Sequence, residues 1–300
     1  MSQEAVNVRR VALVGGTHGN EFTGAYLIKK WQADRRVLER PGLELELLLA
    51  NPKAFAQCRR YIDEDLNRCF SLARLAEPNP ASYESMLAQQ INRQLGPKGN
   101  PRVDFIIDMH TATSPMGTNL VFTHLDPLSL RLAAFVTARF PETVVTSEDE
   151  LVADQYFLNS IARQNVLVEM GPIPQGCLRA DFLSRTEAVV ATILDFLANT
   201  HQPGALPETL EVFHYTKAVY LPTDEQGQIA AMVHPNLLDK PYPTLNPGDP
   251  LFVTFKGDVI PYDGDRPAIA GFVNEAAYYD KKQALYLMRK ETVAVPRHPL

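Results

Sequence analysis

The stretch VALVGGTHGNEFTG, residues 11–24, decides the start of the fold and raises the first question about function. Residues 11–14 are apolar, and a glycine-rich turn follows them directly. Glycine at such a turn indicates a sharp bend of the backbone or the close approach of another group. His18 and Glu21 lie three residues apart in this turn. The group that approaches could be a phosphate or a metal ion, or the stretch could be a turn and nothing more.

Short apolar runs and amphipathic stretches alternate through the first two thirds of the chain. We expect strands at 11–14, 43–50, 103–109, 120–123 and 166–170. We expect helices at 21–31, 82–95, 127–140 and 179–198. Several of the strands are almost continuously apolar, which is typical of strands covered on both faces. The alternation predicts an α/β fold with a mostly parallel or mixed sheet and helices on both faces.

The character of the sequence changes near residue 199. The segment 200–208 (THQPGALPE) is polar and contains two prolines, so we interpret it as a linker. Beyond it, short runs rich in β-branched and aromatic residues are separated by turn signals such as NPGD at 246–249. The sequence therefore predicts two domains, an α/β domain at 1–202 and a smaller, mainly β domain at 203–300.

Composition and charge argue against several classes of function. The chain has 29 Lys and Arg against 35 Asp and Glu, a formal net charge of −6, with no basic block, so we expect no nucleic-acid partner. No apolar run approaches the roughly 18 to 20 residues that cross a bilayer, so we expect no membrane association. The polar start and three cysteines without a C-x-x-C pair favour a reducing, cytoplasmic location.

Polar side chains stand near the carboxyl ends of three predicted strands. His18 and Glu21 follow the first strand, Asp108 and His110 close FIIDMH, and Glu169 lies in VLVEM. Sites in parallel α/β sheets lie beyond these strand ends, so the side chains could converge. Two histidines and one carboxylate are a standard ligand set for catalytic zinc, and a further carboxylate is the natural general base for a water molecule. This set predicts hydrolysis of an amide or ester.

Each of these signals also has a less specific interpretation. The spacing H-x-x-E is weak by itself, and a histidine that ends a buried strand is more often a hydrogen-bonded core residue. Glu169 could belong to an ion pair, because an unpaired buried carboxylate is costly. A phosphate loop is excluded, since no Gly-Lys-Ser/Thr follows GGTHGN. Asp108 precedes His110 by two residues and shares its strand face, so we expect it, or a backbone carbonyl, to orient that histidine.

The segment CRRYIDEDLNRCF, residues 58–70, mixes basic and acidic residues without a clear period. We expect a loop. It could be a solvated surface held by salt bridges, which composition alone favours. It could instead be an anion site, because arginines hold carboxylates in bidentate fashion and can stabilise an oxyanion.

The motifs GGTHGNE, RYIDEDLNR, DMH, VEMGP, HPNL and FVNEAAYY, in this order, resemble the aspartoacylase family. That family belongs to the zinc-carboxypeptidase-like amidohydrolases, together with succinylglutamate desuccinylases, and the chain resembles a microbial member. The resemblance implies a zinc-carboxypeptidase-like catalytic domain at 1–202 and a β domain at 203–300 that covers the active-site cleft. It implies zinc-dependent deacetylation of N-acetyl-L-aspartate to acetate and L-aspartate. Glu275, in the last motif, is expected to support the shape of the site.

The resemblance also implies the catalytic roles. The zinc ligands, for one Zn²⁺ per chain, would be His18, Glu21 and His110. Glu169 would be the base that activates water and then passes the proton to the leaving amine. Arg60 would polarise the scissile carbonyl and hold the tetrahedral oxyanion. A homodimer is the commonest assembly of soluble enzymes, and we expect one here.

Contacts to a small N-acyl amino acid follow from the same resemblance. Asn67 and Arg68 would bind the α-carboxylate, and Tyr278 would reach in from the second domain. One position departs from the family pattern. Asn159 stands where animal aspartoacylases have an arginine for the side-chain carboxylate, and Arg163 is one helical turn away. A deacylase with another substrate, aminoacylase-3-like or a desuccinylase, therefore remains an alternative. A non-catalytic metal-binding module is a further one, although the predicted base argues against it.

Overall fold

The chain folds around one large mixed sheet in the computed structural model, which describes residues 8–149, 155–200 and 204–297. The strand order is β2-β1-β3-β6-β4-β5-β7-β13-β12-β9. The first six strands are β1 (Arg10–Gly15), β2 (Glu44–Leu49), β3 (Phe105–Thr111), β4 (Gly117–Phe122), β5 (Val144–Ser147) and β6 (Gln164–Gly171). The strands β2, β1, β3 and β6 are parallel, and β4 is antiparallel to β6. The predicted α/β fold class is confirmed, and β5 is a strand that the sequence analysis does not predict.

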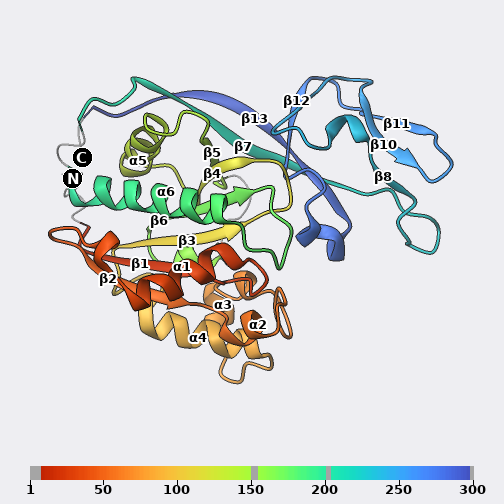
Figure 1. Cartoon of the computed structure of the whole chain (residues 1–300). Helices are drawn as coiled ribbons and strands as arrows, with labels where there is room; N and C mark the ends of the chain where they lie inside the picture. The colour runs from red at the N-terminus through yellow and green to blue at the C-terminus, as the bar shows by residue number, and fades with distance from the viewer. Residues whose placement is uncertain (1–7, 150–154, 201–203, 298–300) are drawn as a thin grey trace.

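Helices cover both faces of this sheet (Figure 1). One face carries α1 (Phe22–Ala33), α5 (Pro127–Thr137) and α6 (Ala180–Ala198). The other face carries α4 (Tyr83–Leu95), beside the short helices α2 (Pro52–Ala56) and α3 (Leu72–Leu75). On β1, Val11 and Leu13 belong to the first core, whereas Ala12 and Val14 belong to the second. This alternation is the period-two pattern of a strand buried on both sides.

Two glycines explain how the chain turns from β1 into α1. Gly16 has φ +67°, a left-handed conformation that glycine adopts without the steric cost of a Cβ. A Cβ on Gly24, in the first turns of α1, would lie only 2.7 Å from the carbonyl oxygen of Met109. The helix can therefore press directly against β3. This close packing places the intervening turn, with His18 and Glu21, at the carboxyl edge of the sheet.

The C-terminal strands extend the same sheet. β7 (Thr209–Tyr220) pairs parallel with β5 and antiparallel with β13 (Gln283–Ala294), and β12 (Ala268–Gly271) and β9 (Thr244–Leu245) complete the sheet. A second sheet contains β8 (Ala231–Val233), β10 (Pro250–Thr254) and β11 (Val259–Pro261), next to the 3-10 helix η4 (Pro235–Leu237). Because β7 and β13 join the sheet of the first part, the division at residues 202 and 203 stays a prediction.

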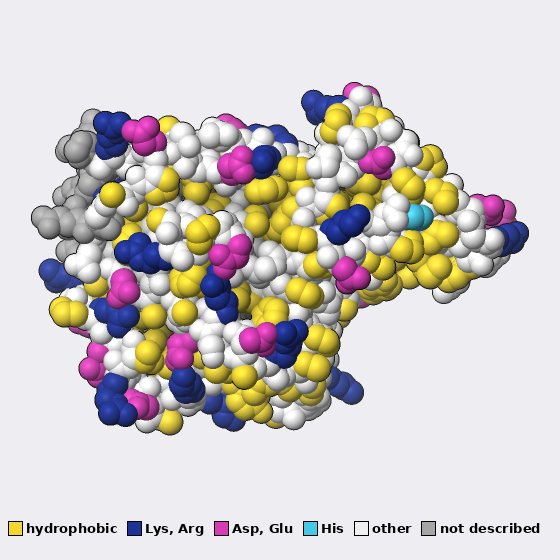
Figure 2. All heavy atoms as spheres, turned by 45° about the horizontal axis from the view of Figure 1, so that its top comes forward, with side chains coloured by type: hydrophobic (Ala, Val, Ile, Leu, Met, Phe, Trp, Pro, Cys, Tyr) yellow, Lys and Arg dark blue, Asp and Glu magenta, His cyan; other side chains and the backbone are white. Residues whose placement is uncertain are grey.

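The second sheet forms a lobe that projects from the larger body (Figure 1). Hydrophobic side chains gather on this lobe in the space-filling view (Figure 2). Met232 in β8, Phe255 directly after β10 and Val259 in β11 are exposed. Charged side chains of both signs are interspersed over the larger body. Among the described residues, no helix has the length and apolar character needed to cross a membrane.

Candidate metal centre and active-site cavity

Three side chains meet where β1, β3 and α1 come together. His18 Nδ1 lies 2.7 Å from Glu21 Oε1, and His110 Nδ1 lies 3.0 Å from Glu21 Oε2. The two Nδ1 atoms are 3.2 Å apart. One ligand atom from each residue falls within 4.8 Å of the others, and all three residues are buried. The structure therefore brings together the three residues that the sequence predicts as metal ligands.

The remaining nitrogen of each imidazole faces a carboxylate. His18 Nε2 lies 2.9 Å from Asp65 Oδ1, and His110 Nε2 lies 3.0 Å from Asp108 Oδ2. With a metal bound, such partners would favour the hydrogen on Nε2 and leave each Nδ1 lone pair for the metal, as in carboxylate–histidine–metal arrangements. The two Nδ1 atoms and the Glu21 carboxylate already lie at short range from one another. This donor set fits a zinc ion.

Charge around the centre has the sign that a cation requires. Burial raises the pKa of Glu21, but His18 and His110 outweigh it and hold that pKa well below its ordinary value. Burial lowers the pKa of His110, but Asp108 and Glu21 outweigh it and raise that pKa well above its ordinary value. Glu21, Asp65 and Asp108 therefore place three carboxylates around the two imidazoles.

Glu169 lies beside this cluster because of strand register. β3 and β6 pair His110 with Glu169, so the two side chains leave adjacent strands on one face. No hydrogen bond ties the Glu169 carboxylate to another described residue. Burial raises its pKa to about 8, and the charges of Glu21 and Glu275 add to that effect against His110. A partly buried carboxyl group without a partner among the described residues, next to a cation site, is what a general base for water requires.

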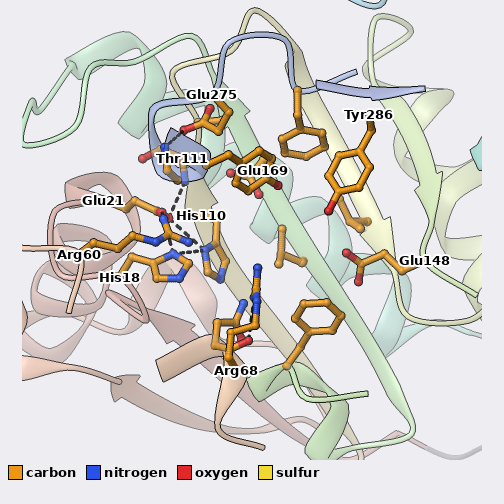
Figure 3. A pocket seen from close by; sticks show the side chains of 18 of the residues that line it. His18, Glu21, Arg60, Arg68, His110, Thr111, Glu148, Glu169, Glu275 and Tyr286 are labelled. Carbon is orange, nitrogen blue, oxygen red and sulfur yellow. Dashed lines mark hydrogen bonds and ion pairs between the residues drawn. The ribbon is translucent and has the colours of Figure 1, made fainter. Parts of the chain in front are cut away.

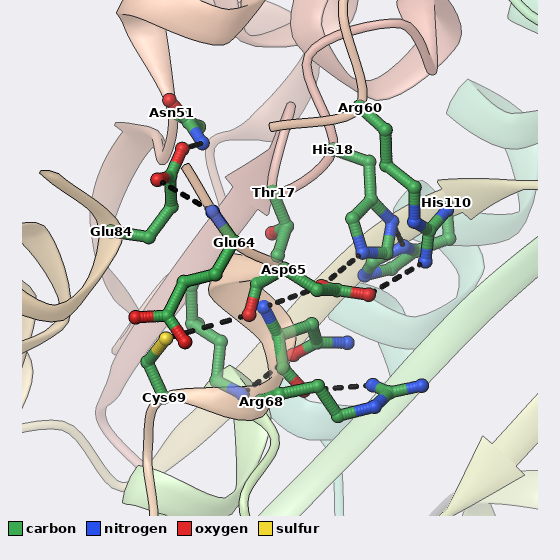
Figure 4. Close-up of polar contacts among 12 residues, drawn as sticks. Thr17, His18, Asn51, Arg60, Glu64, Asp65, Arg68, Cys69, Glu84 and His110 are labelled. Atoms are coloured by element: carbon green, nitrogen blue, oxygen red, sulfur yellow. Dashed lines mark hydrogen bonds and ion pairs between the residues drawn. The ribbon is translucent and has the colours of Figure 1, made fainter. Parts of the chain in front are cut away.

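Arg60 belongs to the same network. Its Nη1 donates to Glu21 Oε1 at 3.0 Å and its Nη2 to Asp65 Oδ2 at 3.1 Å. Asp65 therefore contacts both Arg60 and His18 (Figure 4). Of the two interpretations of segment 58–70, this geometry favours a loop that faces a cavity over a solvated surface. The sequence analysis did not single out Asp65. Asp63, Glu64 and Asp65 are consecutive acidic residues, and the sequence does not show which of them faces the histidine.

A buried glutamate holds the arginine loop in place. Glu84, in the first turn of α4, accepts hydrogen bonds from the backbone N–H groups of Ile62 at 2.7 Å and Asp63 at 3.0 Å. It also accepts one from Asn51 Nδ2 at 3.1 Å (Figure 4). The sequence gives no signal for this role, because an acidic residue in the first turn of a helix is explained by the helix dipole alone.

Asn67 and Arg68 line the cavity from the 3-10 helix η2 (Leu66–Arg68). Asn67 Oδ1 accepts the Leu158 N–H at 2.8 Å, so its Nδ2 is left to donate elsewhere. The Arg68 guanidinium lies over the rings of Tyr156 and Phe157, at 5.2 and 5.3 Å from their centroids. An amide donor and a guanidinium side by side can hold a carboxylate.

The last predicted contact comes from the 3-10 helix η5 (Ala276–Lys281). Tyr278 lines the cavity there, and burial raises the pKa of its hydroxyl well above the ordinary value. The adjacent Glu275 is buried and accepts hydrogen bonds from the Thr113 N–H at 2.8 Å and the Ser114 N–H at 3.0 Å. This contact ties η5 to the loop after β3, as expected of a residue that supports the shape of the site.

Asn159 and Arg163 are not brought to the cavity. Asn159 lies in the 3-10 helix η3 (Leu158–Ile161), is 1% exposed, and donates through Nδ2 to Asn165 Oδ1 at 3.0 Å. Its Nδ2 is engaged in that internal contact and the residue does not line the cavity, so the substrate contact stays a prediction. Arg163 is exposed and does not line the cavity.

The far end of the cavity contains a residue that sequence reasoning missed. Glu148 and Tyr286 point into the cavity from the side opposite His18 and Glu21 (Figure 3). Glu148 directly follows β5, which was itself not predicted. The run VVTS before it is short, but an acidic residue at the end of a β-branched run is the same signal that identified Glu169.

Fold and site together define a class, an α/β protein with a His-Glu-His centre and, beside it, a carboxylate that no described residue pairs with. The model of the succinylglutamate desuccinylase/aspartoacylase catalytic domain matches residues 7–197, and that of the AstE/AspA barrel-sandwich hybrid domain matches residues 208–290. The chain therefore belongs to the succinylglutamate desuccinylase/aspartoacylase family, as its motifs indicate.

Individual relatives match nearly the whole chain. A probable aspartoacylase of Trichodesmium erythraeum is 39% identical over 96% of this chain and 99% of its own. The human N-acyl-aromatic-L-amino acid amidohydrolase (carboxylate-forming) is 38% identical over 97% of this chain and 94% of its own. The crystal structure of murine aminoacylase 3 superposes with a TM-score of 0.92, at 38% identity and covering 98% and 99% of the two chains. The prediction of an enzyme, a hydrolase acting on a linear amide, is confirmed.

Proposed function

We propose that this protein is a zinc-dependent amidohydrolase that cleaves N-acyl-L-amino acids into a carboxylate and a free amino acid. The observation that carries the proposal is the convergence of His18, Glu21 and His110 with an unpaired Glu169 beside them. Zinc held by the three ligands would supply Lewis acidity and a water molecule of lowered pKa.

The chain's own residues account for the remaining steps. Glu169 removes a proton from the attacking water and delivers it to the nitrogen of the leaving amine, so that the amide C–N bond breaks and a carboxylate and an amine form. Arg60, which lines the cavity beside the three ligands, donates to the carbonyl oxygen as negative charge develops on it. Asn67 and Arg68 hold the α-carboxylate, which fixes the amide relative to the base.

The substrate predicted from the sequence is N-acetyl-L-aspartate. A second candidate class has an uncharged side chain, and the position of Asn159 favours it. Among the described residues, the arginines that line the cavity are Arg60 and Arg68. Arg60 is paired with Glu21 and Asp65, and Arg68 is assigned to the α-carboxylate. No further described arginine lines the cavity for a second carboxylate of the substrate.

Parallel assays test both candidates. The zinc-loaded protein is incubated with N-acetyl-L-aspartate and with N-acetyl-L-phenylalanine, and release of the amino acid is compared with that of a chelated sample. Zinc-dependent release from either substrate supports the amidohydrolase, and the larger kcat/KM identifies the side-chain class. A zinc-loaded protein that hydrolyses neither these nor other N-acyl amino acids would contradict the proposal and favour a non-catalytic metal-binding module.

A further inference from the structure

Glu148 lines the cavity, but the proposed hydrolysis of the amide gives it no role. The cavity is continuous from the three ligands to Glu148, and η2 closes another side of it with Arg68 (Figure 3). If the acyl group lies at the metal centre and the α-carboxylate at Arg68, the third substituent of the substrate's Cα must occupy the remaining space. That substituent is the amino-acid side chain, so Glu148 lies at the end of the side-chain pocket.

Besides its charged residues, the cavity is lined by many apolar or aromatic side chains. These include Val121, Phe157, Leu167, Tyr215, Phe272 and Tyr286. Tyr215 packs edge-on against Tyr286, with ring centroids 4.7 Å apart, and lies 6.0 Å from Phe272. Flat rings of this kind bury a planar side chain and offer a charged one little compensation for the water it loses.

Glu148 is partly buried in this lining, and its carboxyl makes no hydrogen bond or ion pair with the described residues. Burial raises its pKa to about 7, although Arg68 acts in the opposite direction. In either protonation state the Glu148 carboxyl can accept a hydrogen bond. In its ionised form it repels a second carboxylate, such as that of an acidic substrate side chain.

We propose that Glu148 determines which side chains the enzyme accepts: it receives a hydrogen bond from a donor at the tip of a planar, uncharged side chain and excludes acidic side chains. The inference rests on the proposed amidohydrolase function and assigns its substrate class. A tyrosine-like phenol or a tryptophan-like N–H carries such a donor at the far end of a ring. A phenylalanine-like side chain fills the pocket but leaves Glu148 without a partner, and an aspartate-like side chain adds a second negative charge.

The test compares kcat/KM for N-acetyl-L-tyrosine, N-acetyl-L-phenylalanine and N-acetyl-L-aspartate in the zinc-loaded protein and two variants. The first two substrates differ by one hydroxyl, so their ratio isolates the hydrogen bond. We expect the wild type to prefer the tyrosine substrate, and Glu148→Leu to lower that preference about tenfold or more, because a bond to a charged acceptor is lost. Glu148→Gln keeps an acceptor and removes the charge. It should preserve the tyrosine preference and raise the relative rate on the aspartate substrate about fivefold or more.

The control is Glu225→Gln, which alters an exposed glutamate in the segment before β8 and should leave all three ratios unchanged. If the wild type hydrolyses these substrates and neither Glu148 variant changes the ratios, the role of Glu148 is wrong and the amidohydrolase stands. A wild type that prefers the aspartate substrate would also overturn the inference. If the zinc-loaded wild type hydrolyses no N-acyl amino acid, the proposed function fails first.

Discussion

The two ends of the cavity differ in how their charged side chains are paired. At the metal centre, His18, Glu21, Arg60 and Asp65 form a closed network in which charged groups partner one another at 2.7 to 3.1 Å. At the far end, Glu148 stands among aromatic rings without a described partner. A network that is satisfied internally keeps its geometry before a ligand arrives, which is what the positioning of reacting atoms requires.

A hydrogen-bond acceptor without a donor can contribute to selectivity rather than to positioning. A buried acceptor without a partner costs free energy until a ligand supplies the donor, so it distinguishes ligands that carry the donor from those that do not. The comparison therefore separates the end proposed to perform the chemistry from the end proposed to select the substrate. It also implies that substitutions at the two ends should change different measured quantities.

The largest effect is expected from removing a metal ligand. His110→Ala takes away one of the two imidazoles and leaves Glu21 and Asp108 without their shared partner. We expect bound zinc to fall well below one ion per chain and kcat to fall by at least about a thousandfold, since a metal contributes several kcal/mol to the transition state. Elemental analysis of the dialysed protein and the assay above measure both. A variant that retains full zinc would contradict the assigned ligand set.

The next effect separates catalysis from metal binding. Glu169→Gln keeps the size of the side chain but cannot accept a proton from water. We expect kcat to fall by about a hundred- to ten-thousandfold, while zinc content stays at the wild-type level because Glu169 is not one of the three ligands. Activity within about threefold of the wild type, with zinc retained, would show that another group is the base.

A smaller effect is expected at the network that orients His18. Asp65→Asn removes the charge that faces His18 Nε2 and Arg60. We expect zinc affinity to fall by about 10- to 100-fold, as at other carboxylates behind a metal-bound histidine, measured by competition with a chelator.

Asp63→Asn is the matched control for this prediction. Asp63 lies in the same loop, but it accepts a hydrogen bond from the Tyr83 N–H and does not contact the centre. Its zinc affinity should equal that of the wild type. Equal losses in the two variants would mean that the loop, rather than the Asp65 carboxylate, is what matters.

The smallest effect concerns stability at the selective end. Burial raises the pKa of Glu148 to about 7, whereas a glutamate in the unfolded chain titrates at about 4.3. Between these values the folded protein binds a proton that the unfolded chain does not, so this group's contribution to the free energy of unfolding is full below about pH 4 and is lost by about pH 7.

Glu148→Gln abolishes that titration. We therefore expect its Tm, relative to the wild type, to be more favourable near pH 8 than near pH 5, by a few degrees. Thermal unfolding at the two pH values measures the difference, with Glu225→Gln as the exposed control. A Tm difference that is the same at both values would show that the Glu148 carboxyl titrates normally.

Local sequence was sufficient for much of the framework. The apolar runs that predict strands at 11–14, 103–109 and 166–170 correspond to β1, β3 and β6, because strands buried on both faces must be almost continuously apolar. Polar residues lie at or near the carboxyl ends of all three strands. The spacing H-x-x-E, which is weak by itself, predicts a metal site only together with His110 and Glu169 at the other two strand ends.

The acidic residue at the far end of the cavity carries the same kind of signal, but a much weaker one. The strand β5, with the sequence VVTS, is only four residues long, too short for its pattern to stand out from a loop. Its importance comes from its place in the sheet, between β4 and β7, which directs the residue after it toward the cavity. Sequence spacing cannot show this, because β5 reaches its position through pairings with segments far away in the chain.

The sequence by itself determined the α/β class, because periodicity is a local property. Its strand ends and motifs also predicted His18, Glu21 and His110 as metal ligands and Glu169 as the base. Only the tertiary structure decided which acidic residue of the arginine loop faces His18, that Asn159 turns inward to Asn165, and that Glu148 faces the side-chain pocket. These outcomes depend on which surfaces pack together across the sheet. A side chain's neighbours there come from other elements, and its own flanking residues do not specify them.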